Sequence, residues 1–82
     1  MRFETLRIID SLLEDNVMKQ QMAFDKCVLK LEQVKQEQAK NPEQEDYFEE
    51  SYQFWKNSKK QLGERLDNAN DALADFRSHK WG

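Results

Sequence analysis

Apolar residues recur along the second half of the chain at alternating steps of four and three residues, which is the spacing of a coiled-coil seam. Because residues three and four apart lie on one face of an α-helix, this half predicts a helix over residues 45–79 with a single apolar face. The series has nine positions, one of them a lysine, and contains Phe48, Tyr52, Trp55, Lys59, Leu62, Leu66, Ala69, Leu73 and Phe76.

The first half repeats this spacing less strictly. Two successive steps of four fall across Glu14, Asp15 and Asn16, where Asp or Asn can cap the start of a new helix. We expect one continuous helix over residues 2–40, and a break that gives three helices is the alternative. The seam of this helix contains Leu6, Ile9, Leu13, Val17, Gln20, Phe24, Cys27, Leu31 and Val34.

The strongest helix breaker, Asn41-Pro42, separates these halves. A short turn over residues 41–44 would fold the helices back on each other, and would pair positions whose numbers sum to about 86. Gly63 then lies beside Phe24, where it either allows close approach or is a neutral residue on the solvent side. The expected fold class is all-α: an antiparallel, coiled-coil-like two-helix hairpin, forming one domain over residues 1–82.

Composition limits what such a hairpin can be. The chain is 35% charged and 38% hydrophobic with a net charge of −3, which disfavours a general affinity for nucleic acid. One cysteine and one histidine provide neither a disulfide nor the usual metal clusters, so we expect no cofactor. Since no apolar run reaches the roughly 18–20 residues of a membrane span and the amino terminus lacks a secretion signal, we expect a cytoplasmic protein that does not enter membranes.

Apolar residues also lie outside the seam of the first helix. At about 100° per residue, Met18, Met22 and Leu29 fall within roughly 40° of one another on the side away from the seam, and Ile8 and Leu12 widen the apolar surface near the amino terminus. We predict that two copies meet through these five residues as a homodimeric four-helix bundle, and a different protein partner is the alternative. The function we expect is that of a non-enzymatic adaptor or regulator that binds a larger macromolecule, most readily a protein.

Acidic residues form a stripe on the predicted outer face of the second helix. Carboxylates three and four positions apart repel one another, which costs stability without a local gain. A solvated surface is the simple interpretation. A second is an inhibitor of the phage or mobile-element type, whose acidic face occupies a nucleic-acid-binding groove. The stripe contains Glu64, Asp67, Asp71 and Asp75.

Three aromatic residues lie off the seam. Tyr47 and Phe54 follow the turn, and Trp81 follows the second helix. They are candidates for a binding hot spot, although covering the open end of the core is the alternative for the two near the turn.

Few residues are suited to catalysis. Cys27 lies on the seam near the expected place of Lys59, whose ammonium group can activate a thiol, but a seam cysteine is more often an inert small apolar residue. His79 falls in the last turn of the second helix, where a cation favours the helix dipole. We therefore expect no enzyme. A third function, RNA binding, would use two lysine groups: Lys19, Lys26 and Lys30, and Lys56, Lys59 and Lys60.

Overall fold

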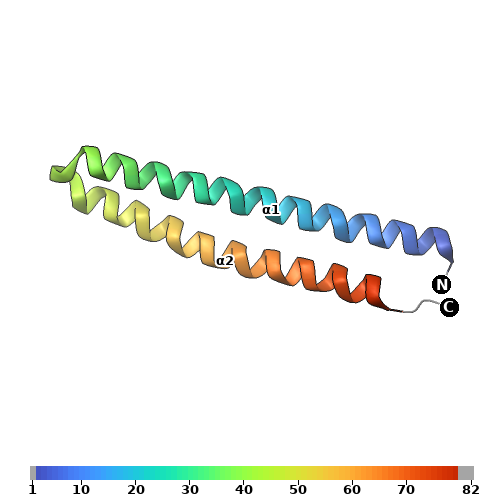
Figure 1. Ribbon diagram of the computed structural model, residues 1–82. Coiled ribbons are helices and arrows are strands. Elements are labelled where there is room, and N and C mark those ends of the chain that lie inside the picture. The colour runs from blue at the N-terminus through green and yellow to red at the C-terminus, as the bar shows by residue number, and fades with distance from the viewer. Residues whose placement is uncertain (1, 80–82) are drawn as a thin grey trace.

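The computed structural model describes residues 2–79, which form two long helices joined by one tight turn. Helix α1 spans Phe3–Lys40, the short 3-10 helix η1 spans Pro42–Gln44, and helix α2 spans Glu45–Ser78. The two helices lie side by side and antiparallel, so that the start of α1 and the end of α2 are at the same end of a rod (Figure 1) measuring 64 × 15 × 13 Å. The expected all-α hairpin is confirmed.

The turn follows from the chemistry of Asn41 and Pro42. The backbone N–H of Asn41 donates to the carbonyl oxygens of Glu37 and Gln38, at 3.0 and 3.3 Å, and its side-chain amide also donates to Glu37 at 3.0 Å. These bonds occupy carbonyl groups that the end of α1 would otherwise leave without partners. Pro42 has no N–H to continue the helix, and Gln44 N–H donates to the Asn41 carbonyl oxygen at 3.0 Å, which closes the turn.

Helix α1 is continuous through Glu14, Asp15 and Asn16, as expected from the sequence. The Asn16 side chain accepts a hydrogen bond from the Gln20 amide at 3.5 Å and does not cap a new helix. The alternative of three helices is therefore wrong, and the irregular spacing is a small shift within one long helix.

The core between α1 and α2 is thin. Among residues 2–79, four are buried: Cys27, Leu31, Phe48 and Ala69. The other apolar seam residues are only half-buried, because each helix has one neighbour and water reaches both sides of the seam. Lys59, placed on the seam by its spacing, is instead exposed, and the adjacent Ser58 is half-buried. The ammonium group of Lys59 favours solvent, so the smaller Ser58 side chain lies on the inward side of α2 at this point.

Contacts between the helices confirm the predicted pairing to within about one helical turn. An added Cβ atom at Gly63 would lie 3.5 Å from Phe24 Cε2, so this glycine faces the partner helix and not open solvent. The Cys27 thiol donates to the Trp55 carbonyl oxygen at 3.3 Å. Within residues 2–79, neither helix has a stretch both long and apolar enough to cross a membrane.

Candidate interaction surfaces

The five apolar residues predicted to meet a partner are all exposed. Ile8, Leu12, Met18, Met22 and Leu29 keep 57–63% of their surface accessible, whereas Leu31, two positions beyond the last of them, keeps 7%. We call these five residues the α1 outer face. They extend over about 32 Å at 1.5 Å per residue, along much of the length of the helix. Packing of α1 against α2 therefore leaves all five residues of the α1 outer face exposed.

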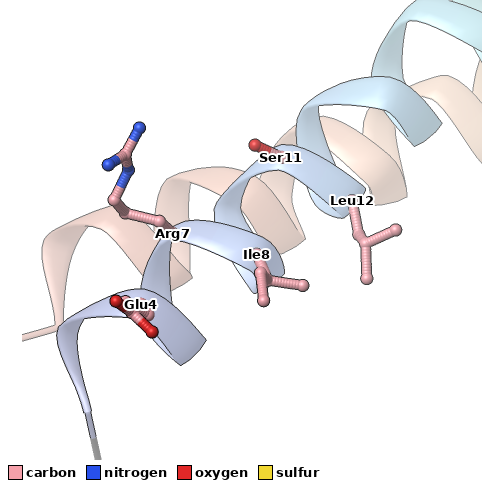
Figure 2. Close-up of a pocket in the computed structure, with 5 residues that line it drawn as sticks. All are labelled: Glu4, Arg7, Ile8, Ser11 and Leu12. Carbon is pink, nitrogen blue, oxygen red and sulfur yellow. The ribbon is translucent and has the colours of Figure 1, made fainter.

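Near the amino-terminal end this face borders a shallow hollow. The hollow is lined by Glu4, Arg7, Ile8, Ser11 and Leu12. Figure 2 shows Ile8 and Leu12 projecting side by side from α1, while Arg7 extends in another direction and α2 runs behind. Two adjacent aliphatic side chains with a charged rim are suited to receiving an apolar side chain of another helix.

The acidic stripe is also exposed along its whole length. Glu64, Asp67, Asp71 and Asp75 lie on α2, on the side away from α1 by their spacing. No basic side chain within residues 2–79 forms an ion pair with any of the four. Their charges remain available to an outside partner.

A charged cluster joins the two helices at the open end of the rod. The Arg77 guanidinium donates to both carboxylate oxygens of Asp10, at 2.9 and 3.1 Å, and to Glu14 at 2.7 Å. These hydrogen bonds lower the pKa of Asp10 and raise the pKa of Arg77, each stabilising the charge of the other. The sequence analysis missed this cluster, although the predicted pairing of positions places residue 10 opposite residue 77.

Two of the three predicted aromatic residues stand exposed near the turn. Tyr47 and Phe54 are 70% and 61% exposed, so they do not cover the end of the core. Each packs edge-to-face on its seam neighbour, Tyr47 on Phe48 and Phe54 on Trp55, with ring centroids 5.2 and 5.1 Å apart. The third, Trp81, lies outside the described residues.

The candidate groups for chemistry are not brought together. Cys27 is 2% exposed, and its thiol is hydrogen-bonded to backbone. Among residues 2–79, no three His, Cys, Asp or Glu side chains are grouped as metal ligands. The six lysines considered for RNA are all exposed, three on each helix.

Comparison with known protein families, with curated proteins and with solved structures finds no match to this chain.

Proposed function

We propose that the protein is a non-enzymatic interaction module that pairs with a second copy through the α1 outer face and acts by binding a larger protein. The observation that carries this proposal is the group of five exposed apolar side chains along one side of a helix whose opposite side is already packed. Apolar patches of this kind mark protein contacts more often than they remain in solvent. A second hairpin bearing the same patch would bury both patches by symmetry, giving a four-helix assembly.

The size of the apolar gain indicates how strong this pairing is. Burying the exposed part of one such side chain contributes on the order of 1 kcal/mol, so ten side chains in a dimer contribute on the order of 10 kcal/mol. Association costs about 4–15 kcal/mol in lost freedom of motion. The gain and the cost are of similar size, so the proposed dimer should be weak and reversible, and the loss of two apolar side chains should abolish it.

Light scattering after size exclusion tests the proposal on the intact chain. The wild type should have the mass of a dimer, and a Met22→Glu, Leu29→Glu variant should have the mass of a monomer, because two apolar contacts of each copy are replaced by carboxylates that favour water. An Asn57→Glu, Gln61→Glu variant is the matched control, since it adds the same charge at exposed positions of α2. A wild-type monomer, or a variant that stays dimeric, would contradict the proposed self-association.

The exposed acidic stripe favours a second candidate function, inhibition of a nucleic-acid-binding protein. In this proposal the exposed carboxylates of the acidic stripe occupy a basic groove in place of phosphates. Proteins held from a cell extract by the immobilised wild type should be released by added duplex DNA, and an Asp67→Lys, Asp71→Lys variant of unchanged helicity should hold none of them. Retention by the variant equal to that of the wild type would contradict this function.

A further inference from the structure

The charged residues beside the α1 outer face are not distributed evenly. Its first half carries Glu4, Arg7 and Asp15, and the part from its middle onward carries Lys19, Lys26 and Lys30, all of them exposed. At about 100° per residue, Asp15 and Lys26 fall close to the centre of the face. A partner that lies along this face has to satisfy both charges as well as the apolar side chains.

We propose that the occupant is a second copy running antiparallel, in the register that sets Asp15 opposite Lys26 of that copy. The inference rests on the self-association proposed above and adds its direction and register. Two-fold symmetry makes this ion pair twice, once at each side of the axis. A parallel pairing would instead set Asp15 against Asp15 and Lys26 against Lys26, which repel.

The same register also pairs the apolar residues. With residue 15 opposite residue 26, Leu12 falls opposite Leu29, and Met18 lies within one position of Met22. Four of the five residues of the face thus meet apolar partners, and Ile8 meets the stem of Gln33. A register shifted by about one helical turn would instead set Ile8 against Leu29. In that register Asp15 faces Met22, so the ion pair is lost, and Lys30 faces Arg7, which adds a repulsion between two cations. The register also brings two like-charged pairings: Glu4 with Glu37 at the outer limit of the contact, and Lys19 with the second copy of Lys19 near its centre, about 4.5 Å apart along the axis. The long Lys19 side chains can extend to solvent, which limits the cost of the second pairing.

This register fixes how the four helices are arranged. The face lies on the side of α1 away from α2, as the exposure of its residues and Figure 2 both indicate. The two α1 helices therefore lie in the middle of the assembly and the two α2 helices lie outside, in a row and not in a closed bundle. Both acidic stripes then stay open to solvent.

Charge reversal tests the pairing of Asp15 with Lys26. Asp15→Lys alone and Lys26→Glu alone should each weaken the dimer by about tenfold, because attraction becomes repulsion at two symmetric sites. The double variant should return to within about threefold of the wild-type dissociation constant, as restored complementarity requires. Lys60→Glu, at an exposed position of α2, is the control, and it should neither weaken the dimer nor rescue Asp15→Lys. Sedimentation equilibrium measures all of these constants.

Disulfide trapping gives a second readout that does not depend on the charges. In a Cys27→Ala background, Asp15→Cys with Lys26→Cys should form a covalent dimer on mild oxidation, whereas either cysteine alone should not. In the proposed register the two copies of residue 15 lie about 16 Å apart, beyond the reach of a disulfide. Cross-linking by the single variants would show a parallel dimer. A wild-type dimer with neither rescue nor trapping would overturn the register alone, and a monomeric wild type would overturn the self-association as well.

Discussion

At the scale of the residue, Gly63 of α2 lies beside the Phe24 ring of α1. A glycine in the middle of a helix costs roughly 0.5–1 kcal/mol relative to alanine. The space beside Gly63 still accommodates a methyl group, since an added Cβ would meet Phe24 Cε2 at 3.5 Å, an ordinary van der Waals distance. The position therefore tolerates a small side chain although it faces the partner helix.

We expect Gly63→Ala to stabilise the hairpin. The gain in helix propensity should raise the melting temperature by roughly 3–6 °C for a chain of this size. Thermal unfolding followed by circular dichroism measures the change, with Asn57→Ala as a control for helix propensity alone at an exposed position. A lower melting temperature for Gly63→Ala would mean that Phe24 cannot accept the added methyl group.

At the scale of the element, the open end of the rod is held by the charged cluster of Arg77 with Asp10 and Glu14. Hydrogen bonds from Arg77 lower the Asp10 pKa below its ordinary value of 3.8. A carboxyl group whose pKa is lower in the folded chain stabilises the fold above its ordinary pKa, and this contribution is lost as the pH falls through the lowered value.

Arg77→Gln should therefore have a lower melting temperature than the wild type at neutral pH. At acidic pH the two proteins should have the same melting temperature. The two curves should begin to approach each other below about pH 4 and should meet once the pH is below the lowered pKa of Asp10, because protonation of Asp10 removes the same interaction in the wild type. Melting temperatures measured from about pH 7 to about pH 2 give the comparison, and Lys60→Gln is the control for loss of one positive charge. A constant difference between wild type and Arg77→Gln across this range would show that Asp10 is not the linked group.

The helices and their pairing were predictable because they depend on short-range rules. Pro42 ends the first helix whatever structure follows it. A four-residue turn then leaves few ways to pair the two seams. Lys59 was placed on the seam but is exposed, since a strict seam spacing does not tell which of two adjacent residues turns inward. The Arg77 cluster was not predicted, because its contacts depend on the exact rotation of both helices about their own axes. Exposure of the α1 outer face was predictable from its spacing, but what covers it depends on a molecule that the sequence pattern does not name.

At the scale of the whole molecule, the hairpin is long for the core that it contains. A rod of 64 Å has four buried residues, and these lie at two levels: Cys27, Leu31 and Phe48 toward the turn, and Ala69 in the other half. The amino-terminal part of α1 has no buried residue, yet it carries Ile8 and Leu12 on its outer side. Self-association through α1 would add apolar contacts where the hairpin has fewest.

Stability should therefore depend on protein concentration. For a folded dimer that unfolds to separate chains, the melting temperature should rise by a few degrees, about 3 °C, for each tenfold increase in concentration. Leu29→Ala should match the wild type in dilute solution and fall below it as concentration rises, because the residue is exposed in the hairpin and buried only in the dimer. Leu31→Ala, the matched control two positions away, should lose roughly 2 kcal/mol or more at every concentration, because it leaves a cavity in the hairpin core. Calorimetry over a hundredfold range, about 5 to about 500 µM, separates the two effects. A wild-type melting temperature independent of concentration would mean that α1 does not meet a second copy, and the α1 outer face would then belong to a different protein partner.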